Sequence, residues 1–223
     1  MMTKTIRNTG LISTISIIIL VVFFIAGVFT VPPVEYTNAT MFSRQYTSAQ
    51  LLPLIPSFLL TLANIPLFVA LFLLAEKNLK VNALLGLIAG LAYSFFSGLT
   101  YFLQMSILPN AVNSGNHAVI DLLAMTSPVS LTYALDNLGY FFLSLSFLFF
   151  GFIFKSGKLQ QSIRIISWLY AFSGIAGFAG YISESRGLEN LVLLSAIPYL
   201  IAIILIMFFF RNSNANHEQG FSR

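Results

Sequence analysis

Long apolar runs separated by short polar stretches dominate the hydrophobic pattern of this chain. A helix needs about 20 mostly apolar residues to cross a hydrocarbon core of roughly 30 Å. Six runs reach or approach this length, and they predict helices at 11–30, 51–75, 81–108, 131–154, 165–182 and 191–210. The pattern therefore predicts an all-α fold, in which residues 1–223 form a single domain that is an integral membrane bundle of six transmembrane helices.

The first run also has the features of a cleaved signal peptide, because Lys4 and Arg7 precede it and small residues occur at 26–27. Its apolar stretch of about 20 residues is longer than the roughly 7–15 residues of a signal-peptide core. We therefore expect this segment to remain as a membrane anchor.

The Lys and Arg residues alternate with the predicted spans. With six spans, nine of the 11 basic residues fall on one side of the membrane: Lys4, Arg7, Lys77, Lys80, Lys155, Lys158, Arg164, Arg211 and Arg223. Arg44 and Arg186 fall on the other side. Because cytoplasmic loops retain positive charge during insertion, this pattern predicts a multi-pass protein of the cell membrane with both termini in the cytoplasm. A model with five or seven spans would break the alternation.

Composition supports the membrane class and narrows the chemistry. Hydrophobic residues make up 57% of the chain and charged residues 8%, against roughly a quarter charged in soluble proteins. The chain contains no cysteine, and its two histidines, His117 and His217, lie outside the apolar runs. We therefore expect neither a cofactor nor a metal ion. The net charge of +4 is spread over the ends of the runs, so we expect the lipid bilayer as a partner and no nucleic acid.

Small residues follow one face of the third span. Gly86, Gly90, Ser94 and Gly98 recur every four residues, which places them in one stripe along a helix. The fifth span has a similar concentration of Gly, Ser and Ala between 173 and 180. Since small residues let membrane helices approach closely, we expect both spans to be central and tightly packed. A homodimer face or a hinge is the alternative.

Asp136 is the only ionisable residue well inside a predicted span. It lies about six residues beyond the start of the fourth span, which is roughly 9 Å deep. Around it, Tyr133, Asn137, Tyr140 and Ser144 are placed at helical spacing and make one polar stripe. Because ionisable groups inside a bilayer are costly and usually functional, this face is not expected to contact lipid.

Polar residues of other spans lie at a similar depth, mostly in the outer half. The second span carries Ser57, Thr61 and Asn64, the third carries Tyr93, Ser97, Thr100, Tyr101 and Gln104, and the sixth carries Ser195 and Tyr199. A polar cavity open to the outside would shield them from lipid. The predicted ligand-binding residues are Asp136, Asn137, Tyr133, Tyr140, Asn64, Thr61, Tyr101 and Gln104. Two alternatives remain open, namely hydrogen bonds that join helices and an interface for a membrane partner protein.

The sequence lacks the residue sets of a membrane enzyme. A serine hydrolase needs a base near its nucleophile, and no predicted span contains a histidine or a lysine. Aspartyl chemistry needs two neighbouring carboxylates, and only Asp136 is available in the spans. We therefore expect no enzymatic activity.

The predicted outer loops carry two further features. Asn38, Ala39 and Thr40 match a glycosylation sequon, although three-residue matches often arise by chance. Residues 118–125 have the composition of a short helix on the outer surface, with an irregular connector as the alternative.

Six spans around an external polar pocket resemble, in size and topology, the substrate-binding subunits of energy-coupling-factor vitamin transporters. The resemblance implies binding or transport of a small molecule. The chain departs from that pattern because its first span lacks an evident stripe of small residues for a partner. The best hypothesis is therefore small-molecule binding or transport, and the alternative is an accessory or scaffold membrane protein that acts with a partner.

Overall fold

The computed structural model describes residues 2–212, and these residues are almost entirely helical. His217 and Arg223, which entered the sequence predictions, lie outside the described residues. The six long helices are α1 (Lys4–Thr30), α3 (Leu51–Leu74), α4 (Lys80–Ser106), α7 (Leu131–Gly151), α8 (Lys158–Ile182) and α10 (Leu191–Asn212). The short helices are α2 (Ala39–Gln45), α5 (Leu108–Ser114), α6 (His117–Leu123) and α9 (Arg186–Glu189), and two 3₁₀ turns occur at Ser48–Gln50 and Lys77–Leu79.

The six predicted spans are confirmed as helices. Each long helix is long and apolar enough to cross a membrane, and together they define a multi-pass membrane protein. Their ends agree with the apolar runs within a few residues except at the starts of α1 and α8, which begin at Lys4 rather than 11 and at Lys158 rather than 165. The apolar run marks only the part of a helix that fits the hydrocarbon, whereas α1 and α8 begin with polar turns.

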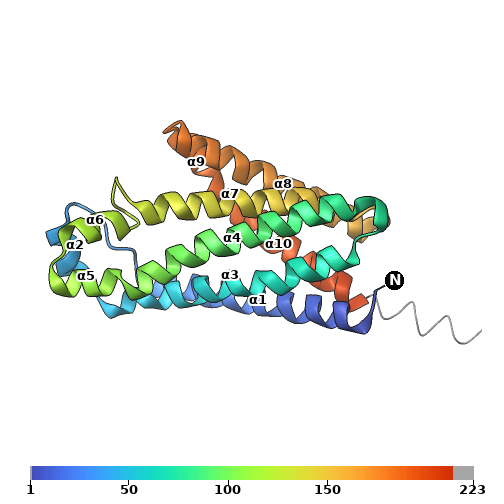
Figure 1. The fold of residues 1–223 in the computed structure, drawn as a ribbon, viewed down its shortest axis with the longest axis horizontal. Helices are drawn as coiled ribbons and strands as arrows, with labels where there is room; N and C mark the ends of the chain where they lie inside the picture. Colours follow the sequence, from blue (N-terminus) through green and yellow to red (C-terminus); the bar gives the residue numbers. More distant parts are fainter. Residues whose placement is uncertain (1, 213–223) are drawn as a thin grey trace, which may run out of the picture.

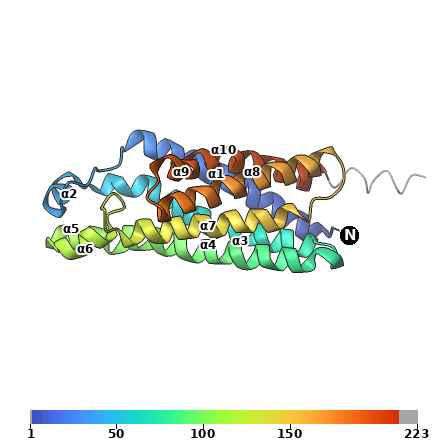
Figure 2. The same cartoon turned by 90° about the horizontal axis from the view of Figure 1, so that it is seen from above.

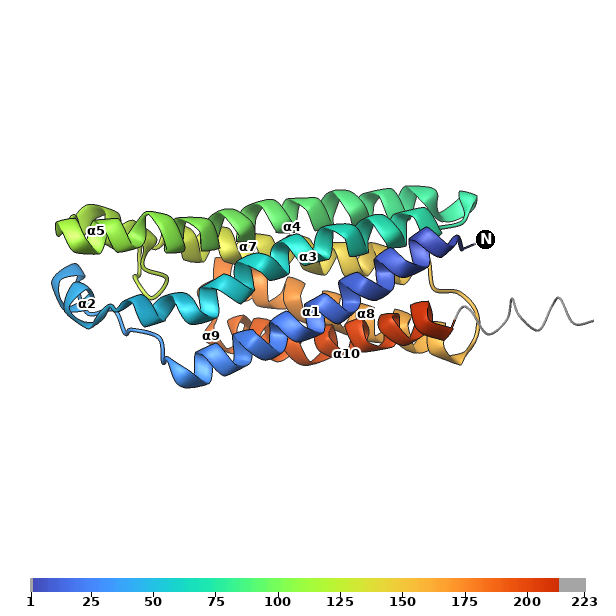
Figure 3. The ribbon, with the colours of Figure 1, turned by 90° about the horizontal axis from the view of Figure 1, so that it is seen from below.

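The six long helices form a closed bundle (Figure 1). Each packs against the next in the chain, and α10 returns to α1. Seen from above, α3, α4 and α7 lie on one side, with α8 and α10 on the other (Figure 2). The short helices α2, α5 and α6 gather at one end of the bundle, which we call the cap end, and the N-terminus lies at the opposite end (Figure 3).

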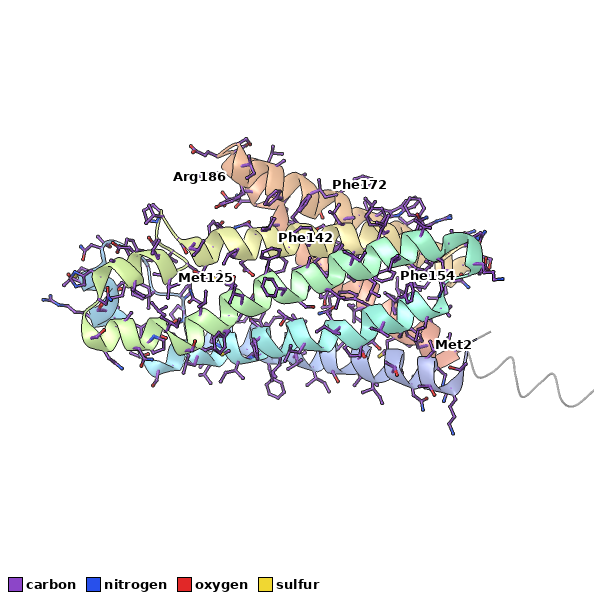
Figure 4. All side chains as sticks on the ribbon, viewed as in Figure 1. Met2, Met125, Phe142, Phe154, Phe172 and Arg186 are labelled. Carbon is purple, nitrogen blue, oxygen red and sulfur yellow. The ribbon has the colours of Figure 1, made fainter. Side chains whose placement is uncertain are left out.

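The opposite end carries most of the positive charge, so we call it the basic end. Lys155 Nζ lies 3.1 Å from Glu76 Oε2, which links the two loops at this end. Lys80 donates a 2.7 Å hydrogen bond to the carbonyl oxygen of Phe72 and lies over its ring. Figure 4 shows Phe154 near this end, whereas Arg186 lies at the far tip of α9. The segregation of charge predicted from the sequence is therefore present in the fold.

Polar side chains start several helices at defined residues. The Ser130 hydroxyl accepts a 3.0 Å hydrogen bond from the backbone N–H of Tyr133 and so begins α7. Asn38 accepts a 2.9 Å bond from the N–H of Met41 and begins α2. The asparagine of the sequon therefore acts as a helix cap.

Glycines of α4 and α8 allow close helix contacts, as the small-residue pattern predicted. A Cβ atom at Gly90 would overlap the Phe68 ring of α3, and one at Gly177 would overlap Val192 of α10. The expectation that these two helices are central is wrong. Each packs between two neighbours and keeps one side exposed, because a closed ring of six helices has no surrounded member. Phe95 of α4 is 64% exposed and Phe172 of α8 is 62% exposed.

The interior changes in character along the bundle axis. The basic-end half is filled by apolar side chains such as Leu71, Phe150 and Phe210. Buried polar side chains concentrate toward the cap end; they include Thr61, Asn64, Ser97, Thr100, Gln104, Thr132 and Asp136. A candidate site therefore lies in the cap-end half.

The cap end has a small apolar core of its own. Phe42 of α2, Leu108 of α5 and Ile120 of α6 are buried together there. The helix predicted near 118–125 is confirmed as α6, although it packs on α2 and α7 instead of lying alone on the surface. Tyr36 donates a hydrogen bond to Asp121 of α6. This bond stabilises the protonated form of the Tyr36 hydroxyl and so raises its pKa.

Candidate ligand-binding site

Asp136 lies inside the bundle, on the side of α7 that packs against α4. Its side chain is 8% exposed, and Oδ2 accepts a 3.4 Å hydrogen bond from the Tyr101 hydroxyl. The Tyr101 and Tyr140 hydroxyl oxygens are 3.2 Å apart. Asp136 and Tyr140 are one helical turn apart and so share a face of α7. We call Asp136, Ser97, Tyr101 and Tyr140 the Asp136 cluster.

Two oxygen atoms of the Asp136 cluster have no hydrogen-bond partner among residues 2–212. They are Asp136 Oδ1 and the hydroxyl oxygen of Ser97. The Ser97 side chain is fully buried and lies beside the Asp136 carboxyl group, without the geometry of a hydrogen bond. A buried polar atom without a partner costs about 1–3 kcal/mol. The cluster is therefore incomplete as a purely structural hydrogen-bond network.

Two glycines bring the neighbouring helices close to this part of α7. A Cβ atom at Gly139 would overlap the Ser97 hydroxyl of α4, so only glycine leaves room for Ser97 beside α7. In the same way, Gly174 of α8 accommodates the Ser144 hydroxyl of α7. Because glycine has no side chain, these two residues let α4 and α8 approach α7 closely at the site.

Five aromatic rings from four helices extend from Tyr140 of the Asp136 cluster toward the basic end, and we call them the aromatic layer. They are Tyr93, Tyr140, Phe147, Tyr170 and Tyr199. The ring centroids of Tyr93 and Tyr140 are 6.0 Å apart, and those of Tyr170 and Tyr199 are 5.5 Å apart. Phe147 packs edge-on against Tyr170 at 5.1 Å and Tyr199 at 5.5 Å. Such spacings are those of favourable aromatic pairs.

Asn64 joins the aromatic layer through a hydrogen bond. The Tyr199 hydroxyl donates to Asn64 Oδ1 at 3.2 Å, which connects α10 with α3 across the bundle. The Asn64 amide nitrogen donates to the carbonyl oxygen of Leu60 at 2.8 Å. Asn64 therefore lies at the centre of the bundle, as predicted, but it contacts Tyr199 and not Asp136.

Four predicted residues lie outside this arrangement. Gln104 donates to Thr132 at 3.0 Å and to the Leu123 carbonyl oxygen, so it fastens α4 to α6 and α7. The Thr61 hydroxyl donates to the Phe58 carbonyl oxygen of its own helix at 2.7 Å. Their groups are used in the structure of the bundle, so they do not form one cavity lining with Asp136.

Tyr133 and Asn137 point to a different neighbour. Tyr133 donates a hydrogen bond to Glu189 of α9, and its ring packs edge-on against Tyr181 of α8. Asn137 donates to the carbonyl oxygen of Tyr133 at 2.9 Å. These two residues are one turn apart and face α8, whereas Asp136 and Tyr140 face α4. The polar face of α7 is therefore divided between two helix interfaces.

Some residues of the arrangement were not among the predicted ligand-binding residues. Ser97, Tyr93 and Tyr199 were visible as polar residues at the right depth, yet their spacing gave no reason to prefer them. Tyr170 could have been found, because Tyr170, Gly174 and Gly177 recur at helical spacing and form one buried face of α8. Extending the small-residue stripe by one turn would have identified it.

Neutral hydroxyl groups line the approach to Asp136. The Tyr101 hydroxyl donates to its carboxyl group, and the Tyr140 hydroxyl lies 3.2 Å from that of Tyr101. The basic residues of the described spans lie in the terminal turns at the basic end. Residues 2–212 contain no group of three His, Cys, Asp or Glu side chains that could hold a metal ion. The arrangement can accept a proton or a positively charged group, and it can stack on flat or apolar groups.

A depression of about 490 Å³ occurs elsewhere, at the loop between α1 and α3. It is lined by Val31, Pro32, Pro33, Val34, Glu35, Thr37, Gln45 and Gln50. The depression is open and separate from the Asp136 cluster, whose side chains are buried.

The fold and the site define a class: a multi-pass membrane protein with six spans and a buried acidic and aromatic centre. No family model, curated protein or solved structure matches the chain.

Proposed function

We propose that this protein binds a small molecule at the Asp136 cluster and the aromatic layer, and transports it across the cell membrane. The observation that carries the proposal is the buried carboxyl group of Asp136, which keeps one oxygen without a partner. In this proposal the basic end faces the cytoplasm, because positive charge is retained there. The Asp136 cluster then belongs to the outer half of the membrane. The proposal assigns the protein no catalytic activity.

The energetics of the carboxyl group favour a functional role. An aspartate at a helix centre costs about 2.5–3.5 kcal/mol on insertion scales, and less near the interface. Hydrogen bonds between membrane helices contribute only about 0.6 kcal/mol each. The single 3.4 Å bond from Tyr101 therefore offsets little of the cost. A bound ligand or ion that meets the carboxyl group supplies the missing interaction.

The aromatic layer supports a small-molecule ligand. Ligand sites are mostly apolar and aromatic, with a few polar groups that fix orientation. Here the layer lies next to two polar groups, because Tyr140 is in contact with Tyr101, the partner of Asp136, and Tyr199 is hydrogen-bonded to Asn64. The site is closed toward the cap end, where Tyr133 is bonded to Glu189 and Gln104 to Leu123. Transport requires these hydrogen bonds to open, so they define the proposed outer gate.

The second candidate is an accessory or scaffold protein that acts with a membrane partner. It is favoured by the polar groups that are satisfied within the bundle, such as the pair of Tyr199 and Asn64 and the Gln104 contacts. Those bonds are sufficient to fasten helices to one another. They do not account for the unpartnered atoms of Asp136 and Ser97.

Native mass spectrometry of the purified protein tests the proposal. We expect the wild-type protein to retain a small molecule, and we expect Asp136→Ala to lose it. Asp121→Ala is the matched control, because it removes a carboxyl group at the cap end and should retain the molecule. A wild-type protein that carries no small molecule, or an Asp136→Ala variant that retains it fully, would contradict the proposal.

A further inference from the structure

The two unpartnered oxygen atoms of the Asp136 cluster lie on facing helices. Asp136 Oδ1 belongs to α7 and the Ser97 hydroxyl to α4, and both are buried. Asp136 Oδ2 accepts the bond from Tyr101, so a donor at Oδ1 is the missing element on the carboxyl group. The Ser97 hydroxyl oxygen can accept from such a donor, because it lies beside the carboxyl group and has no partner of its own.

No positive charge faces Asp136 from the elements packed on α7. From α4 the facing groups are the hydroxyls of Tyr93, Tyr101 and Ser97, and on α7 itself there is Tyr140. Among the neighbours toward the cap end, Asp121 of α6 is engaged by Tyr36 and Glu189 of α9 by Tyr133. From α8, Tyr170 faces Tyr140 and Tyr199 instead. An ionised carboxylate here would have no countercharge among residues 2–212.

We propose that Asp136 is a proton-binding site, in which Oδ1 carries an exchangeable proton and donates it in a hydrogen bond to the Ser97 hydroxyl. In the protonated state both unpartnered atoms gain a partner once the two side chains turn toward each other, and the carboxyl group is neutral inside the bundle. The O–H bond that forms is at Oδ1, the O–H bond that breaks belongs to a hydronium ion, and water is released. No oxidant or further reactant is needed.

The geometry favours a proton over larger cations. Hard metal ions take about six or more oxygen ligands, and only Asp136 Oδ1 and the Ser97 oxygen are unengaged in the cluster. An organic cation would have to separate the rings of the aromatic layer, whose centroids lie 5.1–6.0 Å apart in this closed arrangement. A proton requires neither extra ligands nor extra volume.

The hydroxyls of Tyr101 and Tyr140 extend the site toward the middle of the bundle. Asp136 Oδ2, Tyr101 and Tyr140 form a continuous hydrogen-bonded series, with distances of 3.4 and 3.2 Å. Buried ionisable side chains mark proton pathways in membrane pumps and transporters, and here Asp136 is the ionisable member of the series. The role of the proton as the coupling ion rests on the proposed transport function, but its binding at Asp136 is measurable without any ligand.

Infrared difference spectroscopy of the full chain in lipid nanodiscs, recorded against pH, tests the proton site. We expect the wild-type protein to show a carboxylic-acid C=O band at neutral pH that shifts in D₂O and is lost as the pH rises. Asp136→Asn should lack this band, and the matched control Asp121→Asn should keep it. Ser97→Ala should keep the band at a higher frequency, because the acid loses its acceptor.

Several results would overturn the proton site. They are absence of the band from the wild-type protein at neutral pH, its persistence in Asp136→Asn, and its loss on adding Na⁺ at constant pH, which would indicate a metal ion. If Asp136→Asn does not fold, Asp136→Glu retains the carboxyl group and should shift the band, and an unshifted band would overturn the proposal. A band without a retained small molecule would show that the proposed transport function fails while the proton site holds.

Discussion

At the scale of single residues, the Asp136 carboxyl group decides how the bundle interior is interpreted. The sequence predicted that this residue faces the interior and bonds a polar group of the second or third span. Tyr101 is confirmed as that partner, whereas Asn64 pairs with Tyr199 and Gln104 with Thr132. Helical spacing assigns a residue to a face, but it does not give the rotation of the neighbouring helix. The choice among several polar candidates at one depth therefore needed the structure.

Tyr101→Phe tests the hydrogen bond to Asp136. Removing the hydroxyl takes away the donor that Asp136 has among residues 2–212, so we expect a loss of about 1 kcal/mol in the free energy of unfolding, between the average of about 0.6 and the maximum of about 1.7 kcal/mol for bonds between membrane helices. Thermal unfolding in detergent measures it. Tyr46→Phe is the matched control, because the buried Tyr46 hydroxyl has no partner among the described residues and its loss should not destabilise the protein. Equal effects of the two changes would contradict the assignment.

At the scale of helices, the small residues of α4 and α8 correctly predicted close helix contacts. They wrongly predicted that these two helices lie at the centre of the bundle. Gly90 and Gly177 do face neighbouring helices, since a side chain at either would overlap Phe68 or Val192. The pattern identifies a face that touches a helix, but it does not count how many helices surround the element. The number of neighbours is set when α10 packs on α1, which closes the ring of helices. This contact joins the first and last long helices, so no local sequence pattern predicts it.

Gly90→Leu and Gly177→Leu should both impair folding. A leucine side chain at either position must displace a neighbouring helix, and such overpacking costs about 1–3 kcal/mol. Gly187→Leu is the matched control, because a Cβ atom at Gly187 meets nothing within 4 Å. The yield of monodisperse protein and its thermal unfolding measure the effect. Two well-folded variants would show that these glycines do not lie at helix contacts.

At the scale of the whole molecule, the two ends of the bundle differ in charge and in interior chemistry. Basic residues and an apolar interior lie at one end, and buried polar groups lie toward the other. The six spans and the alternation of charge were predictable, because both depend on local composition. The division of the polar face of α7 between α4 and α8 was not, because it depends on tertiary packing.

The central claim is that six spans enclose the Asp136 cluster, with the basic end in the cytoplasm. Because the chain contains no cysteine, single cysteines can be introduced and labelled from either side. A membrane-impermeant maleimide added to intact cells should label Thr37→Cys and Asn113→Cys at the cap end. It should label Asn78→Cys and Ser156→Cys at the basic end only after the cells are permeabilised. Labelling of a basic-end cysteine in intact cells, or protection of both cap-end cysteines, would contradict the claim.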